Sequence, residues 1–296
     1  MGYRAEKDKI DKKSKRLKFI LLGIGVVALA IIILITQIFP VRTWKYSFGL
    51  PNTGNREAGE MRIHFLCEER NGATVVELPD GKILLIDGGG AGGTSEKTLL
   101  RYLNALDVDE IDYLVVTSTK ESRCGGLEEV LQNKKVSQVY LPTTTPVTGS
   151  EYAKFYAQLI KENCERVYYS RNMKLPSNAE QSKYAFACLY PYTLDAGTGL
   201  EKEESAFWLT YAGVNFLFSD ISAEAETLLM RDDSLGLLKN HGIDLRATDF
   251  IKLSVGNAPS EKFLGYLGAE RVNGEMGAHT VITITADGNS TTEKVN

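Results

Sequence analysis

The hydrophobic pattern of the chain begins with an uninterrupted apolar run over residues 19–39, which contains no charged residue and no proline. A helix of this length, at 1.5 Å per residue, covers a hydrocarbon core of about 30 Å, so the run predicts a transmembrane helix. A cleaved signal peptide has a shorter apolar region that ends in small residues, whereas this run ends in Gln37-Ile38-Phe39-Pro40. We therefore expect an uncleaved membrane anchor.

From residue 61 onward, short apolar runs bounded by turn residues alternate with amphipathic segments. The short runs predict strands over 61–66, 73–78, 82–87, 111–117, 138–141, 166–169, 185–189, 205–211, 214–219, 250–255, 281–285 and 291–295. The amphipathic segments predict helices over 95–106, 127–132, 152–163 and 223–230. Hairpins at both ends, with strands and helices alternating between them, indicate an α/β domain whose mixed sheets are covered by helices.

Charge orients the chain relative to the membrane. Residues 1–18 hold eight Lys or Arg and three acidic residues, and only Arg42 and Lys45 follow the apolar run closely. By the positive-inside rule, residues 1–18 form a basic cytoplasmic tail and the chain from Pro40 onward lies outside. Residues 40–60 have little apolar periodicity and are interpreted as a linker, which leaves 61–296 as an extracytoplasmic domain of a single-pass protein of the cell membrane.

Composition leaves the predicted fold unchanged and serves only to exclude some functions. The hydrophobic share of 43% and the charged share of 24% are ordinary for a globular protein. The net charge is −4, and because the tail carries +5, the remainder carries −9. Binding of nucleic acid depends on neutralising phosphates with a basic surface, so direct binding of DNA is not expected, in spite of the 14 tyrosines.

Several segments of the outer part follow one another in the order found in a known family. Residues 61–89 read MRIHFLCEERNGATVVELPDGKILLIDGG, and residues 110–126 read EIDYLVVTSTKESRCGG. With 135–142, 203–220 and 245–256, they resemble the metallo-β-lactamase-like domain of the ComEC-type competence proteins, the DNA-uptake channel family of bacteria. The resemblance implies a metallo-β-lactamase-like αββα four-layer sandwich, with a metal site where loops meet at one edge of the two sheets.

The chemistry of that family requires two divalent ions, zinc or manganese, which activate a water molecule and are held by clustered His and Asp. Its H-x-H-x-D-H motif corresponds to residues 118–123, which read STKESR, and a later His pair corresponds to 254–255. The positions that correspond to ligands are Ser118, Lys120, Ser122, Arg123, Ser254 and Val255. The bridging aspartate of the family has a counterpart, Asp220.

These substitutions predict the loss of the metal centre. Lys120 and Arg123 place two positive charges where the family holds cations, and like charges 4 Å apart repel by about 4 kcal/mol at an effective dielectric constant of about 20. A second alignment treats His241-Gly242 as the remnant of the His pair, which would leave one His with Asp220, a poor zinc site. We therefore expect no zinc or manganese and no catalytic residue.

The former site is expected to carry other features. Cys67 and Cys124 fall on loops that border it, and disulfides are permitted outside the membrane, so a Cys67–Cys124 bridge is one hypothesis and two unlinked thiols are the other. Lys120, Glu121 and Arg123 could also form a small anion-binding patch.

Three functions stay open at this point. The leading interpretation is a membrane-anchored pseudoenzyme, a non-catalytic binding or scaffolding module for an unidentified membrane or cell-surface protein. The alternatives are a metal-dependent hydrolase or nuclease of the competence type with an atypical site, and an accessory part of a DNA-uptake or envelope complex.

Overall fold

The computed structural model describes residues 18, 20–31, 56–66, 72–91, 94–162, 164–175, 184–191, 204–252, 258–272 and 279–295. The chain divides into two units, residues 1–50 and residues 51–296. In the first unit, residues 20–31 form a helix. No helix within the described ranges is both long and apolar enough to cross a bilayer. The rest of the expected span, residues 19 and 32–39, lies outside the described residues, so the span stays a prediction.

The second unit contains two mixed β-sheets. The eight-stranded sheet has the order β13-β12-β1-β2-β3-β4-β5-β6, and the five-stranded sheet has the order β11-β10-β9-β8-β7. The strands of the first are β1 (Met61–Phe65), β2 (Thr74–Glu77), β3 (Ile83–Ile86), β4 (Glu110–Val115), β5 (Lys135–Leu141), β6 (Glu165–Tyr168), β12 (His279–Ile284) and β13 (Ser290–Val295). The strands of the second are β7 (Tyr184–Tyr190), β8 (Ser205–Tyr211), β9 (Val214–Asp220), β10 (Phe250–Lys252) and β11 (Glu270–Val272). Pairing is parallel from β3 to β6 and from β9 to β11, and antiparallel elsewhere.

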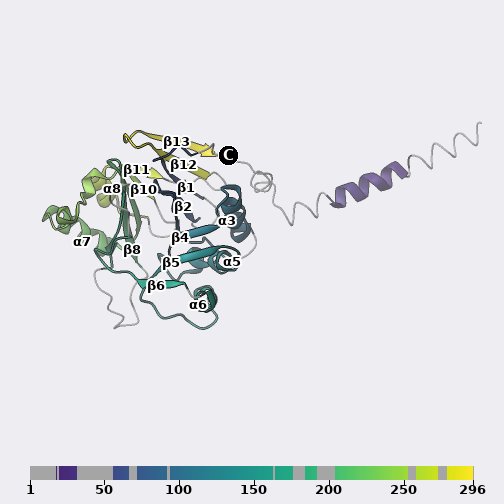
Figure 1. Cartoon of the computed structure of the whole chain (residues 1–296), viewed down its shortest axis with the longest axis horizontal. Helices are drawn as coiled ribbons and strands as arrows, with labels where there is room; N and C mark the ends of the chain where they lie inside the picture. Colours follow the sequence, from purple (N-terminus) through teal and green to yellow (C-terminus); the bar gives the residue numbers. More distant parts are fainter. Residues whose placement is uncertain are drawn as a thin grey trace, which may run out of the picture. The chain divides into compact units, whose positions relative to one another are not determined.

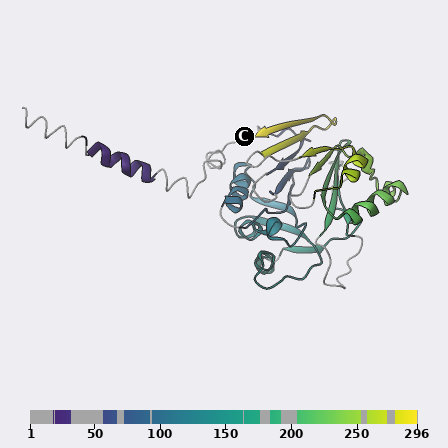
Figure 2. The ribbon, with the colours of Figure 1, turned by 180° about the vertical axis from the view of Figure 1, so that it is seen from behind.

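Helices cover the outer faces of both sheets. Those on the eight-stranded sheet are α3 (Thr94–Ala105), α4 (Glu121–Cys124), α5 (Leu127–Asn133) and α6 (Glu151–Glu162). Those on the five-stranded sheet are α7 (Ala223–Ser234), α8 (Glu261–Leu267) and two short 3₁₀ helices, η2 (Lys239–His241) and η3 (Leu245–Ala247). Figures 1 and 2 show the resulting helix–sheet–sheet–helix layering from two sides. The predicted α/β class and the mixed, helix-covered sheets are confirmed.

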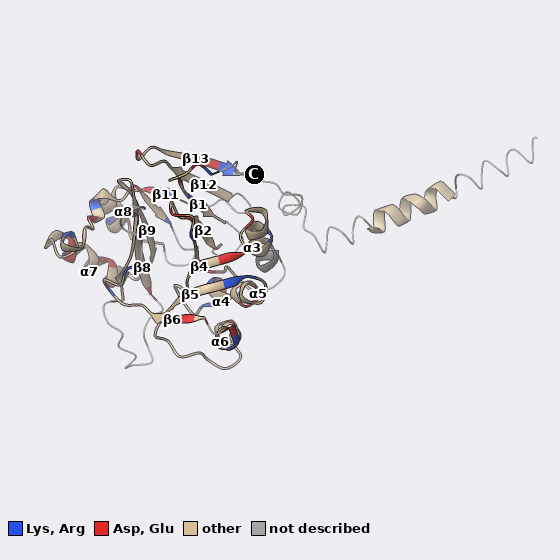
Figure 3. Ribbon diagram, in the orientation of Figure 1, with Lys and Arg blue, Asp and Glu red and all other residues tan. Residues whose placement is uncertain are grey.

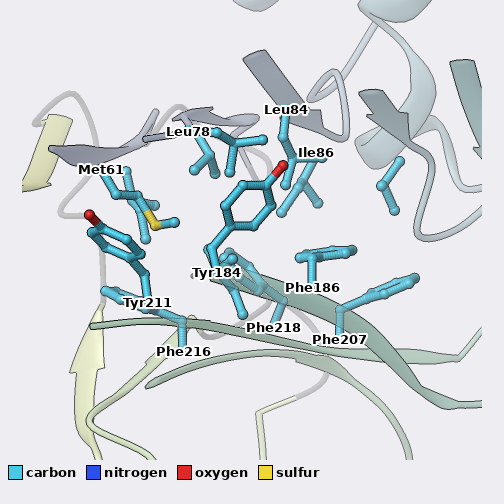
Figure 4. Close-up of a cluster of buried hydrophobic side chains, with 14 of the residues drawn as sticks. Met61, Leu78, Leu84, Ile86, Tyr184, Phe186, Phe207, Tyr211, Phe216 and Phe218 are labelled. Carbon is cyan, nitrogen blue, oxygen red and sulfur yellow. The ribbon is translucent and has the colours of Figure 1, made fainter. Parts of the chain in front are cut away.

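The main hydrophobic core lies between the two sheets. Figure 4 shows aliphatic side chains such as Leu84 and Ile86 from one sheet facing the aromatic rings of Phe186, Phe207 and Phe218 from the other. A second cluster packs α7 and α8 against the opposite face of the five-stranded sheet. Burying each large side chain contributes about 1.5–3 kcal/mol relative to leaving it exposed. Both clusters lie within residues 51–296, so this unit contains the core that it needs to fold without residues 1–50.

Two α-helices on the five-stranded sheet differ from the sequence prediction. Helix α7 continues to Ser234 rather than ending at residue 230. The polar residues that seem to end its apolar pattern are buried and paired: Asp232 binds Arg171 at 2.7 Å and Asp233 binds the hydroxyl of Tyr266 at 2.7 Å. The seven-residue helix α8 is absent from the prediction, because it is too short to show a helical period.

Candidate functional site: an ion cluster between the two sheets

The residue at the centre of the site is Arg123, on α4. Its Nη1 lies 3.2 Å from Oδ2 of Asp87, which follows β3, and its Nη2 lies 2.8 Å from Oδ2 of Asp220, which ends β9. The Arg123 side chain is 4% exposed, and those of Asp87 and Asp220 are 1% and 8% exposed. Since β3 and β9 belong to different sheets, one guanidinium joins the two sheets at their edge.

The carboxylate of Asp87 is held in place by Thr117, which follows β4, and by Arg123. Its backbone has a φ of +60°, a conformation that aspartate tolerates better than most residues. The backbone N–H of Thr117 donates to Oδ1 at 2.8 Å, and the Thr117 hydroxyl lies 2.7 Å from Oδ2. These bonds, together with Arg123, satisfy a charge that would otherwise be costly to bury.

Glycines bring α4 close enough to deliver Arg123. The N–H of Gly88 donates to the carbonyl of Arg123 at 2.6 Å, and the N–H of Gly125 donates to the carbonyl of Gly89 at 3.0 Å. A Cβ at Gly125 would lie 2.0 Å from the backbone nitrogen of Ala91, and one at Gly88 would lie 2.6 Å from a carbon of Leu127. The glycine-rich loop after β3 therefore serves close packing against α4 and α5.

A small cavity of about 10 Å³ adjoins the cluster, with room for about one water molecule. Lys252, on β10, lines this cavity together with Asp87, Arg123 and Asp220. Its Nζ donates to the hydroxyl of Thr74, on β2, at 2.8 Å, so that a second cation also connects the two sheets.

The structure corrects one expectation about this site. Two positive charges are present, but the second is Lys252 rather than Lys120, which is exposed and does not line the cavity. Lys120 is the N-cap of α4, before the first helical residue, and its side chain is exposed, whereas that of Arg123 is buried. The three side chains of the possible anion patch do not share one environment, because Arg123 is buried while Lys120 and Glu121 are exposed.

The other positions that correspond to metal ligands lie beside the cluster or cannot be placed. Ser118 is fully buried and its Oγ accepts a hydrogen bond from the N–H of Lys120 at 3.1 Å. Ser122 is half-buried and does not line the cavity. Ser254 and Val255 lie outside the described residues.

Two further expectations concern a cysteine pair and a histidine. Cys124 is buried, with its Sγ 3.3 Å from the carbonyl oxygen of Lys120. Cys67 lies outside the described residues, so the Cys67–Cys124 bridge stays a prediction. His241 is exposed on η2 and does not line the cavity, which gives no support to its reading as a remnant ligand.

Sequence reasoning did not single out Asp87, Thr117 or Lys252. The first two could have been found, because each is a polar residue immediately after a buried apolar run, at the edge where sheet loops meet. Lys252 gives no such signal. It is a charged residue in an apolar strand, and its hydrogen-bond partner, Thr74, is distant in sequence.

The donor set does not fit the two-metal centre that the resemblance implies. Such ions need three or four ligands from His, Cys or carboxylate side chains. Among the residues described by the structure, no group of three such side chains is placed to hold an ion. The two carboxylates of the site are both bound to Arg123.

A second buried polar cluster lies under α3, on the outer face of the eight-stranded sheet. Nδ1 of His64 lies 2.7 Å from the hydroxyl of Tyr102, and its Nε2 lies 2.8 Å from Oε1 of Glu77. The Tyr102 ring stacks on His279, with centroids 5.6 Å apart. Burial raises the pKa of Tyr102 well above its ordinary value, so the phenol stays protonated and can donate to His64.

Burial and charge act in opposite directions on Glu77. Burial alone would raise the pKa of its carboxyl, but the hydrogen bond from His64 and the charges of His64, Arg56 and Arg62 together lower the pKa below its ordinary value. Glu77 therefore accepts a hydrogen bond from Nε2 of His64 as a carboxylate.

Comparisons with known proteins give no family. No protein-family model and no curated protein sequence matches the chain. CmlA, a diiron β-hydroxylase from Streptomyces venezuelae, is 14% identical over 67% of this chain with a TM-score of 0.40, and the match spans only 35% of that protein. A diphosphatase of the PhnP family is 12% identical over 71% of this chain and 83% of that one, with a TM-score of 0.41.

The solved structures that match also include YhfI from Bacillus subtilis, described as a metallo-β-lactamase-fold protein. It is 10% identical over 66% of this chain and 70% of that chain, with a TM-score of 0.39. All three TM-scores lie below 0.5. The specific resemblance to the competence proteins stays a prediction.

Proposed function

We propose that residues 51–296 form a non-catalytic domain of the metallo-β-lactamase type, in which the ion cluster of Arg123, Asp87 and Asp220 replaces a metal centre. In this proposal, the chain is anchored by residues 19–39, and the domain outside the membrane binds or scaffolds a partner. The observation that carries the proposal is the Arg123 guanidinium between Asp87 and Asp220, at 3.2 and 2.8 Å.

A guanidinium can hold two carboxylates but cannot perform the chemistry of a metal. It carries a permanent charge and five N–H donors in a fixed plane, which suits a bridge between two anions. It offers no coordination position at which a water molecule could be activated, which is the step that a catalytic ion supplies. The cavity beside it, of about 10 Å³, has room for about one water molecule.

The alternative, a metal-dependent hydrolase with an atypical site, is favoured by one observation. Asp87 and Asp220 converge on a single point from two sheets, and both are carboxylates that divalent ions accept as ligands. If Arg123 moved away, these two side chains would be available to an ion.

Activity assays separate the two proposals. The full chain would be tested on β-lactam, phosphodiester and carboxylic ester substrates with zinc or manganese added, beside Asp220→Asn as the matched control. We expect the wild-type chain and the variant to show the same turnover as buffer. Metal-dependent turnover that is lost with a chelator and in Asp220→Asn would overturn the pseudoenzyme proposal.

A further inference from the structure

Two exposed leucines lie close together at the end of α7. Within the described part of residues 51–296, the large apolar side chains that are exposed are Val147, Ile160, Tyr168, Leu235 and Leu237. Leu235 is 66% exposed and Leu237 is 44% exposed, and only one residue separates them. Single exposed apolar residues are common, but two such leucines in one turn require an explanation.

The turn that carries these leucines is well ordered by its own hydrogen bonds. The N–H of Gly236 donates to the carbonyl of Asp233, and the N–H of Leu237 donates to the carbonyl of Asp232, both at 2.9 Å. Gly236 has a φ of +73°, as this helix ending requires. Leu235 and Leu237 are therefore presented to solvent by a defined turn.

Cationic side chains surround the turn. Arg231 and Lys262 line an open pocket of about 310 Å³, together with the ring of Tyr266. The guanidinium of Arg246 lies over that ring, 5.0 Å from its centroid. We call this surface the α7–α8 patch; it consists of Arg231, Leu235, Leu237, Lys239, Arg246 and Lys262.

Most of the acidic side chains near the patch are buried or paired with a cation. Asp232 is buried and is shared by two guanidiniums, at 3.1 Å from Arg231 and 2.7 Å from Arg171. Buried Asp233 accepts from the hydroxyl of Tyr266, Lys239 pairs with Asp244 at 3.4 Å, and exposed Glu261 pairs with Arg271 at 3.3 Å. The side chains of Arg246 and Lys262 are themselves exposed. Figure 3 shows the Lys and Arg positions on α7 and α8.

We propose that the α7–α8 patch docks on an anionic phospholipid bilayer. Leu235 and Leu237 enter the interface between headgroups and acyl chains, while Arg231, Lys262 and Arg246 contact lipid phosphates. Apolar insertion combined with cations around it is the general mode by which surface segments bind anionic membranes.

The choice of a bilayer rests on the proposed function, in which residues 19–39 anchor the chain. Since Arg56 and Gly59 already bond to the domain, residues 40–55 supply the tether, which reaches at most about 55 Å when fully extended. A tether of this length holds the domain near the lipid surface at a high effective concentration, so weak contacts suffice for docking. The chemistry of the patch supplies those contacts.

The test uses residues 51–296, which lack the proposed anchor and contain their own core. Binding would be measured by flotation with vesicles of phosphatidylcholine alone and with phosphatidylcholine plus phosphatidylglycerol. We expect at least about fivefold more binding to the anionic vesicles, since each Lys or Arg near an anionic surface contributes roughly that factor.

Three variants assign the binding to the patch. Leu235→Ser with Leu237→Ser, and separately Arg231→Gln with Lys262→Gln, should each reduce vesicle binding about fivefold or more. Ile160→Ser is the matched control, because Ile160 is 56% exposed on α6, outside the patch, and it should bind as the wild type does. All of these side chains are exposed, and circular dichroism with thermal melting would verify that each variant folds.

Equal binding to both kinds of vesicle, no binding by the wild type, or full binding by the leucine variant would overturn the proposal. The proposal would also be overturned if millimolar inorganic phosphate displaced the wild type from vesicles while the leucine substitutions left binding unchanged. The ligand would then be a soluble phosphate. The outcome is independent of the Arg123 site, since metal-dependent turnover would overturn the proposed function and leave vesicle binding of residues 51–296 unchanged.

Discussion

The two buried polar clusters of this domain differ in what they connect. The Arg123 cluster joins Asp87 and Asp220 across the two sheets with charges that cannot be neutralised at the arginine. The cluster of His64 and Tyr102 joins one sheet to the helix that covers it, through hydrogen bonds of the His64 ring to the Tyr102 hydroxyl and to the Glu77 carboxylate. The arginine-centred ion cluster at the edge of the sheets and the histidine-centred hydrogen bonds under α3 should therefore contribute very different amounts to stability.

The largest effect is expected at the ion cluster. Arg123→Leu leaves two buried carboxylates without their cation, and breaking a buried ion pair in this way costs about 3–5 kcal/mol. Urea unfolding of residues 51–296 would measure the loss. Arg166→Leu, at an exposed position on β6, is the matched control and should change the free energy of unfolding by less than about 0.5 kcal/mol.

A triple variant sharpens this prediction. Adding Asp87→Asn and Asp220→Asn to Arg123→Leu removes the uncompensated charges, and part of the lost stability should return. If Arg123→Leu alone costs less than about 1 kcal/mol, the value of an exposed ion pair, the cluster does not hold the two sheets together.

The two lysines near the site provide the next comparison. Lys252→Met removes a charged donor from buried Thr74 and should cost about 1.5–3 kcal/mol, the range for hydrogen bonds to charged groups. Lys120→Met, at an exposed position, should cost less than about 0.5 kcal/mol. Equal losses in the two variants, measured by urea unfolding, would contradict the placement of Lys252 at the site.

Under α3, a smaller loss is expected. Tyr102→Phe removes the hydroxyl 2.7 Å from Nδ1 of His64 and should cost about 1–2 kcal/mol, because a buried acceptor loses its donor. Tyr168→Phe is the control: its hydroxyl also forms a hydrogen bond, to Tyr156, but at an exposed position. A loss in Tyr102→Phe as large as that in Arg123→Leu would remove the distinction between the two clusters.

The smallest effect is expected in the dependence of stability on acidic pH. The pKa of Glu77 is lower in the folded chain than its ordinary value of 4.5, so its contribution to stability is complete above about that pH and is lost as the pH falls through the lowered value. Glu77→Gln should therefore lose less stability than the wild type when the pH is taken from neutral to strongly acidic. Urea unfolding across this range would test it, and parallel curves for the two proteins would contradict it.

The sequence predicted much of the architecture because apolar periodicity is read directly from it. The strand over residues 205–211 was predicted with the bounds that the structure has, since its alternating residues face two different hydrophobic clusters. Helix α8 and strand β11 were not predicted, because elements of seven and three residues carry too little periodicity.

At the site, the sequence showed which metal-ligand positions carry other residues, but not which contacts form there instead. The substituted motif named Arg123 and Asp220, and their side chains lie 2.8 Å apart. It could not show that Asp87 accepts the other side of the guanidinium, or that Lys252 rather than Lys120 approaches the cavity. Both contacts depend on packing between sheets, which local spacing does not encode.

The most direct test is the metal content of the full chain, purified from medium supplemented with zinc and manganese and without a metal-binding tag. Plasma mass spectrometry would give the equivalents of each ion per chain, with Asp220→Asn measured in parallel. If Arg123 replaces the metal centre, both proteins should hold well below one equivalent. One or more tightly bound equivalents in the wild type, lost in Asp220→Asn, would show that the carboxylates bind an ion and that Arg123 does not take its place.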